Sequence, residues 1–230
     1  MTSKIDWHLN LGIIYFSILV CHFMAELFSL NEFSFGCRLA GPITLALLYF
    51  FSSKKNELTF YLFLTLYVVS NVLFNFRDSF HSFLAVYTFL LLRIFALYII
   101  IVKTKNINAL HILTTSFVFL ILFFYLASVT DEVSDHELDT LIIQSILISA
   151  LTGISVMNYF NEENLAHAWL LISTLFFIGL RFIVFIEQFL VESLAHSYSR
   201  PISVILSGIA FFAFYKYIIT SELEESNIKI

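Results

Sequence analysis

Residues 80–102 read FHSFLAVYTFLLLRIFALYIIIV, and Arg93 is the only Asp, Glu, Lys or Arg among them. An α-helix rises about 1.5 Å per residue, so a stretch of this length spans the roughly 30 Å hydrocarbon layer of a membrane. Similar stretches recur along the chain, which is 60% hydrophobic and 13% charged, with a mean hydropathy of +0.90. Soluble domains carry about 25% charged residues. The sequence therefore predicts a multi-pass helical membrane protein.

Polar interruptions on either side of this stretch define the other spans. The predicted fold is an all-α integral membrane bundle of about eight transmembrane helices with short loops, forming one domain over residues 1–230. The expected spans are residues 9–28, 37–52, 57–76, 80–102, 107–128, 140–160, 166–190 and 201–220. The second is short for a crossing. An even number of spans puts both termini on the same side of the membrane.

The distribution of basic residues orients this bundle. The terminal side would carry Lys4, Lys54, Lys55, Lys103, Lys105 and Lys229, against Arg38, Arg77 and Arg200 on the opposite side. Loops rich in Lys and Arg stay in the cytoplasm. The count predicts cytoplasmic termini and an outward-facing acidic loop at residues 131–139. We expect the protein to lie in a bacterial inner (cell) membrane.

Several classes of function lack their sequence signals. The chain carries a formal net charge of −5 and has no basic cluster, so nucleic acid is not a predicted partner. Cys21 and Cys37 lack metal-ligand spacing and fit the role of small core residues. The sequence contains no Gly-rich phosphate loop, no Gly-x-Ser-x-Gly elbow and no paired-His metal motif. No metal and no cofactor are predicted, and the oligomeric state is left open.

A few polar residues fall at membrane depth, where an ionisable group costs about 2.5–3.5 kcal/mol on insertion scales. Counting residues along each span puts His22, Asn71 and Arg181 at similar depths, somewhat outward of the midplane. Arg93 lies near the midplane. Glu26 lies one turn beyond His22 on the same helix face, because residues i and i+4 superpose. These five residues are the candidate site.

Two interpretations of these residues are open. In the structural one, they hold helices together: Glu26 neutralises Arg181 across an interface, while His22 and Asn71 bond to neighbouring helices. In the functional one, they line a polar cavity. Two intramembrane guanidinium groups need anions, and a lipid phosphate matches the planar fork of donors on Arg93 and Arg181. His22 and Glu26 would then form a general base and the group that orients it.

Lys216, in the last span, has two interpretations of its own. A lysine in a final membrane helix can carry a retinal Schiff base. Lys216 lies close to the predicted cytoplasmic end, however, between Tyr215 and Tyr217. Aromatic and basic residues of this kind anchor helices at the membrane interface, with the long side chain reaching toward water. The position therefore favours an interfacial anchor.

In order and position, several segments resemble the YhhN family, the lysoplasmalogenase-like membrane proteins. Residues 38–44 (RLAGPIT) resemble the Lys-Pro-like start of that family's second span. Residues 70–73 (SNVL) stand where the family has a small residue followed by Asp, which puts Asn71 at the Asp position. Residues 89–93 (FLLLR) match the Phe-x-x-x-His pattern of the fourth span, with Arg93 at the His position.

The resemblance continues in the last two spans. Residues 177–181 (FIGLR), running on to Phe189, resemble a Phe-x-x-Ser-Asp segment that ends in Phe, with Arg181 at the Asp position. The closing helix at residues 201–219 is similar to the family's Tyr-rich last span. The resemblance thus covers nearly the whole chain in layout, and it implies the same bundle fold.

The family's activity implies a function for this chain. It is hydrolysis of the vinyl-ether bond of a lysoplasmalogen or related single-chain lipid. His22 and Glu26 would be catalytic, and Asn71, Arg93 and Arg181 would bind the substrate. Asn71 cannot usefully donate a proton and an arginine does not titrate, so these residues favour an alternative. That alternative is a non-catalytic member of the fold that binds or senses a lysophospholipid. A small-solute transporter is a third possibility.

Overall fold

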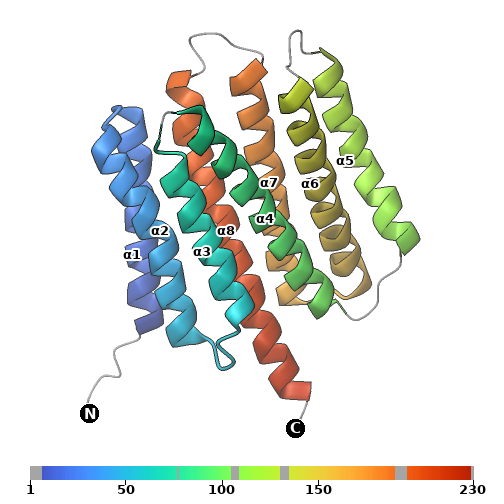
Figure 1. Cartoon of the computed structure of the whole chain (residues 1–230). Coiled ribbons are helices and arrows are strands. Elements are labelled where there is room, and N and C mark those ends of the chain that lie inside the picture. Colours follow the sequence, from blue (N-terminus) through green and yellow to red (C-terminus); the bar gives the residue numbers. More distant parts are fainter. Residues whose placement is uncertain (1–6, 77, 105–108, 130–134, 190–195, 229–230) are drawn as a thin grey trace.

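The computed structural model describes residues 7–76, 78–104, 109–129, 135–189 and 196–228, and all regular structure within them is α-helical. The helices are α1 (Trp7–Leu27), α2 (Asn31–Ser52), α3 (Leu58–Leu73), α4 (Ser79–Lys103), α5 (Ala109–Val129), α6 (Asp135–Asn161), α7 (Leu165–Phe189) and α8 (His196–Ile228). Successive helices run in alternate directions, so α1 begins and α8 ends at the same end of the bundle (Figure 1). We call this the terminal end. The predicted all-α class is confirmed.

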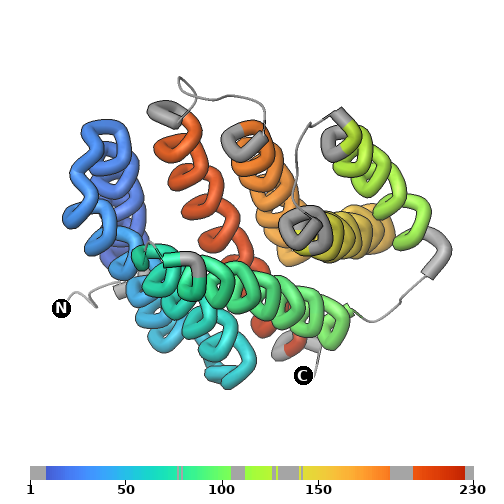
Figure 2. The backbone as a smooth tube through the Cα atoms, turned by 45° about the horizontal axis from the view of Figure 1, so that its top comes forward, coloured from blue at the N-terminus to red at the C-terminus, as the bar shows by residue number. Residues whose placement is uncertain are grey.

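The helices pack as a closed ring with one helix outside it on each side. In the ring, α2, α3, α4, α6, α7 and α8 each contact the next, and α8 returns to α2. Helix α1 packs outside against α2 and α8, and α5 packs outside against α6 (Figure 2). Chain neighbours mostly pack as antiparallel pairs, as short connections require. The ring places α4 and α7, with the two candidate arginines, on either side of α6.

Among the described residues, six helical segments are long and apolar enough to cross a membrane: Leu9–Leu27, Asn31–Ser52, Phe80–Lys103, Ile142–Asn161, Leu165–Ile186 and Ser199–Glu225. Helix α3 and the segment Ile112–Tyr125 of α5 are apolar but shorter. Large apolar side chains such as Phe50, Phe80 and Phe160 are exposed, as expected of a surface covered by lipid. The prediction of a multi-pass integral membrane protein is confirmed, and the count of eight crossings stays a prediction.

Helix α2 begins six residues earlier than the predicted span, so the expected short second span is wrong. The chain reverses between α1 and α2 in a tight turn, in which Ser29 has a positive φ of 56°. The backbone N–H of Leu30 donates to the carbonyl of Ala25 at 2.8 Å and closes this turn. Asn31 and Glu32, which look like loop residues in the sequence, form the first turn of a 22-residue helix. Polar first turns are favourable because helix N-termini attract acidic groups.

Helix α8 extends past the predicted end at residue 220 and reaches Ile228. The added turns begin with Ser221 and Glu222, and Glu222 is only 4% exposed. Glu222 falls on the buried face of α8 because it follows Phe211, Tyr215 and Ile218 at helical spacing, and all three are buried. Helix α6 likewise begins at Asp135 rather than at residue 140. The polar turns at the ends of these helices are therefore helical, although the sequence prediction treated them as loops.

A stack of aromatic rings fills the space between α3 and α8. The Tyr67 ring stacks on Phe211 with centroids 3.7 Å apart, and Phe63 contacts both Phe211 and Phe214. Phe177 of α7 meets Phe211 edge-on at 5.2 Å. Aromatic pairs of this kind add about 0.5–1.5 kcal/mol each beyond their buried area. The many phenylalanines thus serve the core as well as the outer surface.

Candidate functional site

Glu26 is the centre of a polar cluster between α1 and α2. Its Oε1 atom accepts a hydrogen bond from Arg38 Nη2 at 2.9 Å and another from the hydroxyl of Ser34. His22 Nε2 lies 3.7 Å from the same oxygen, beyond hydrogen-bond distance. A carboxylate that accepts charge-assisted bonds is held ionised. We call His22, Glu26, Ser34 and Arg38 the Glu26 cluster.

The predicted pairing of Glu26 with Arg181 is wrong, because Arg38 is the partner. The tight turn at Ser29 folds the start of α2 back along the end of α1, which brings Ser34 and Arg38 beside Glu26. The sequence prediction put Arg38 at the outer edge of a shorter span. The expected proximity of His22 and Glu26 on one face of α1 is confirmed.

A small cavity lies beside His22, enclosed by α1, α2, α3 and α8. Its volume is about 30 Å³, and its lining includes His22, Arg38, Tyr67 and Ser207. A cavity needs at least about 10–15 Å³ to hold one water molecule, so this one has room for a water but not for a lipid headgroup. The buried Nε2 atom of His22 has no hydrogen-bond partner in the described part of the chain. A polar site of this size is suited to water.

Arg93 of α4 and Arg181 of α7 form a second group, away from the Glu26 cluster. They are 5% and 6% exposed. Arg93 Nη1 and Arg181 Nε are buried without a hydrogen-bond partner, and neither side chain forms an ion pair with a described carboxylate. The Arg93 guanidinium lies over the Phe89 ring at 5.0 Å.

Two buried guanidinium groups without a counter-ion are costly, because desolvation of each charge is not offset by a partner. Anions held by arginine forks are the usual compensation. The side chain of Glu187, six residues beyond Arg181, lies outside the described residues. Within the described ones, Arg93 and Arg181 are candidate ligands for an anion.

Asn71 joins neither group through a hydrogen bond. Its side-chain Nδ2 donates to the backbone carbonyl of Tyr67, one turn earlier in α3, at 2.9 Å. The five predicted residues thus divide into the His22–Glu26 pair, the Arg93–Arg181 pair and Asn71. Counting residues along each span predicts depth but not helix rotation, so it could not show which of these side chains lie together.

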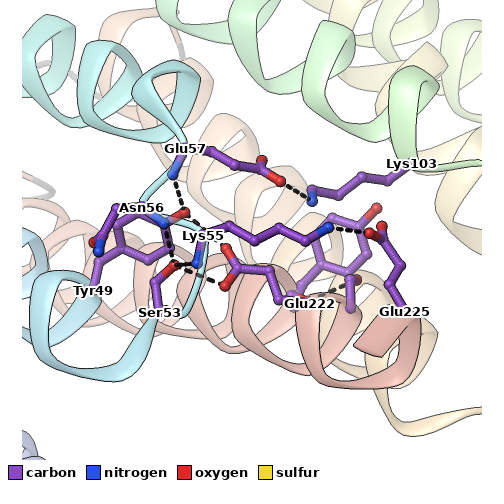
Figure 3. Close-up of polar contacts among 10 residues, drawn as sticks. Tyr49, Ser53, Lys55, Asn56, Glu57, Lys103, Glu222 and Glu225 are labelled. Atoms are coloured by element: carbon purple, nitrogen blue, oxygen red, sulfur yellow. Dashed lines mark hydrogen bonds and ion pairs between the residues drawn. The ribbon is translucent and has the colours of Figure 1, made fainter. Parts of the chain in front are cut away.

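A third polar group, at the terminal end, escaped the sequence prediction (Figure 3). Glu222 accepts hydrogen bonds from the Tyr49 hydroxyl at 2.8 Å and from the Ser53 hydroxyl at 2.7 Å. The Tyr49 and Ser53 oxygens in turn accept from backbone N–H groups of Glu57, Lys55 and Asn56. The connection between α2 and α3 is thereby fixed to α8. We call Tyr49, Ser53 and Glu222 the Glu222 cluster. The helical spacing of the buried residues in α8 is the sequence signal that could have predicted it.

Two ion pairs flank the Glu222 cluster. Lys103 donates to Glu57 at 3.0 Å, and Lys55 pairs with Glu225 (Figure 3). The hydrogen bond to Glu225 raises the pKa of Lys55 above its ordinary value. Lys55 and Glu225 are 39% and 37% exposed, so solvent screens their attraction. This exposed ion pair therefore adds less to stability than the buried hydrogen bonds of Glu222.

The described side chains contain no group of three or more His, Cys, Asp or Glu that could hold a metal ion. No family model, curated protein or solved structure matches the chain. The fold and the polar groups above are therefore the basis for a functional proposal.

Proposed function

We propose that this integral membrane protein binds the phosphate of a single-chain phospholipid between α4 and α7, with Arg93 and Arg181 as its ligands. The observation that carries the proposal is the pair of buried guanidinium groups, each with an unpartnered buried nitrogen. The resemblance in layout to lysoplasmalogenase-like proteins supports a lysophospholipid as the source of that phosphate. Lys55 and Lys103 lie at the terminal end and Arg38 at the other, which supports a cytoplasmic terminal end.

Replacing Arg93 or Arg181 with Met should abolish lipid binding without destabilising the empty protein. Removal of an uncompensated buried charge leaves stability unchanged or improved, whereas loss of one partner of a buried ion pair costs about 3–5 kcal/mol. A ligand at 100 times its Kd stabilises a protein by about 2.7 kcal/mol. Thermal unfolding of the purified protein in detergent, with and without lysophosphatidylcholine, measures both effects.

Two control ligands identify the group that is bound. A monoacylglycerol lacks the phosphate and should not raise the melting temperature. Inorganic phosphate tests whether the ligand is a free anion. If phosphate alone stabilises the protein, the ligand is a small anion and not a lipid. If Arg93→Met and Glu187→Gln both lower the stability of the empty protein by several kcal/mol, the arginines are paired within the protein, and the proposal is wrong.

Hydrolysis of a lysoplasmalogen is a second candidate function, favoured by the unpartnered His22 Nε2 beside a water-sized cavity. A protonated imidazole would donate a proton to the vinyl-ether carbon. Water would then add to the resulting oxocarbenium ion and return one proton to the imidazole, leaving a hemiacetal. Breakdown of the hemiacetal then yields an aldehyde and a glycerophospho-base. Glu26, which accepts hydrogen bonds from Arg38 and Ser34, would orient the imidazole. The small cavity requires the surrounding helices to part before substrate enters.

Aldehyde release from a lysoplasmalogen tests this candidate. His22→Asn and Glu26→Gln should each abolish aldehyde release. The chain offers a matched control, because His81 and Asp78 form another His–carboxylate pair, at 2.7 Å, at the exposed start of α4. His81→Asn should keep full activity. Absence of release from the wild-type protein, or equal loss in all three variants, would reject hydrolysis at the Glu26 cluster.

A further inference from the structure

A long groove runs along the outer surface between α1 and α8. Its volume is about 940 Å³, at the upper end of the roughly 300–1,000 Å³ typical of small-ligand sites. Apolar side chains such as Phe16, Val20 and Phe212 line it, and Lys216 lies at one end. None of the five candidate residues lines this groove. The outer surface of the bundle faces lipid, so the groove opens toward the bilayer.

Gly12 leaves open space in the part of the groove nearer the terminal end. A Cβ atom placed on Gly12 would have no neighbour within 4 Å. A second hollow of about 240 Å³ shares Gly12, Phe212 and Lys216 with the groove and reaches Ser52 of α2. The surface is therefore hollowed on both sides of Gly12, around the point where Lys216 emerges.

Lys216 supplies positive charge to this surface. Its Nζ atom lies 5.7 Å from the centroid of Phe212 and 5.9 Å from that of Tyr215. Unlike Lys55 and Lys103, which pair with acidic residues, Lys216 forms no ion pair with a described carboxylate. No Asp or Glu is among the described residues that line the groove.

The length of the groove matches one leaflet of a membrane. The lining residues of α1 run from Leu9 to Cys21, which is about 18 Å along a helix axis. Half of the hydrocarbon layer is about 15 Å thick. Lys216 lies six residues before Glu222, or about 9 Å deeper in the bundle, and a long lysine side chain can reach the headgroup region from there.

We propose that the groove binds one phospholipid of the surrounding leaflet, with an acyl chain along α1 and an anionic headgroup phosphate at Lys216. A second copy of the chain fits less well. A two-fold contact over this face would bury Lys216 of each copy against a lining without a described carboxylate. An anionic lipid supplies both the apolar chain and the negative charge.

Native mass spectrometry of the detergent-purified protein, titrated with phosphatidylglycerol, tests this proposal. Gly12→Leu fills the groove without a clash and should weaken binding at least about tenfold, the equivalent of losing contact with two CH₂ groups. Gly36→Leu is the matched control, because Gly36 of α2 also has nothing within 4 Å of its Cβ and does not line the groove. It should bind like the wild type. Equal binding by all three proteins would overturn the proposal.

Lys216→Gln tests the headgroup contact separately. It should reduce the preference for phosphatidylglycerol over phosphatidylcholine about fivefold, since one lysine near anionic lipid contributes about 1 kcal/mol. If inorganic phosphate competes with the lipid, the groove binds a free anion. If the lipid-free protein is a dimer and Gly12→Leu abolishes that dimer, the groove binds a second copy of the chain. Gly12 and Lys216 report on the groove, whereas Arg93 and Arg181 report on the proposed internal site, so failure of one proposal is distinguishable from failure of the other.

Discussion

Replacement of Glu222 with Ala should lower the free energy of unfolding by about 3–6 kcal/mol, because two hydrogen bonds are lost and each bond to a charged group contributes about 1.5–3 kcal/mol. Glu222 is 4% exposed and accepts from both Tyr49 and Ser53. The variant leaves the fully buried Tyr49 without its acceptor. It also releases the connection between α2 and α3 from α8. Chemical denaturation in detergent, followed by circular dichroism, measures the change.

Glu225→Ala is the matched control for Glu222→Ala. Glu225 lies one turn further along α8 and pairs with the exposed Lys55. Exposed ion pairs contribute about 0–1 kcal/mol, so this variant should unfold nearly like the wild type. Glu222→Gln keeps one oxygen as an acceptor and should fall between the two. Equal losses from Glu222→Ala and Glu225→Ala would show that the buried hydrogen bonds do not set the stability of this end.

Gly153→Val should separate α5 from the bundle. A Cβ at Gly153 would lie 2.9 Å from the carbonyl oxygen of Ile112 and closer still to the Ser116 hydroxyl, both on α5. Overpacking at such a contact costs about 1–3 kcal/mol or more, because the helix backbones must move apart. Helix α5 rests mainly on α6, with a further ring contact between Phe123 and Phe182 of α7. The variant should unfold at a lower temperature than the wild type, and α5 should be cleaved more readily by protease.

Alanine substitutions at Gly153, Gly208 and Gly179 allow three helix contacts of different closeness to be compared. All three substitutions gain the same helix propensity, about 1 kcal/mol, so differences between them report packing. At Gly208 a Cβ would meet Leu19 Cδ2 at 2.8 Å, but a flexible side-chain end can move. At Gly179 the nearest atom, on Leu206, is 3.7 Å away, an ordinary contact. Stability should fall most for Gly153→Ala, less for Gly208→Ala, and least for Gly179→Ala. Any other order would contradict this account of the helix contacts.

The sequence was sufficient for the helical class and for the shared helix face of His22 and Glu26. Apolar length determines the first, and the spacing of four residues determines the second. Helix rotation depends on side-chain packing between segments far apart in the chain, which composition does not encode. Arg38 therefore took the place predicted for Arg181 beside Glu26. Glu222 was missed because it lies beyond residue 220, where the last predicted span ends.

The position of α8 has a consequence for biogenesis. This last helix packs against α1, α2 and α7, and its Gly208 carbonyl accepts a hydrogen bond from Tyr15 of α1 at 2.8 Å. During synthesis the earlier helices enter the membrane before their final partner exists. Until α8 arrives, the Tyr15 hydroxyl and the α2–α3 connection lack their partners, and the ring stays open. Long-range contacts of this kind delay folding until late in synthesis. A chain truncated before α8 should therefore leave α1, α2 and α7 without the helix that joins them.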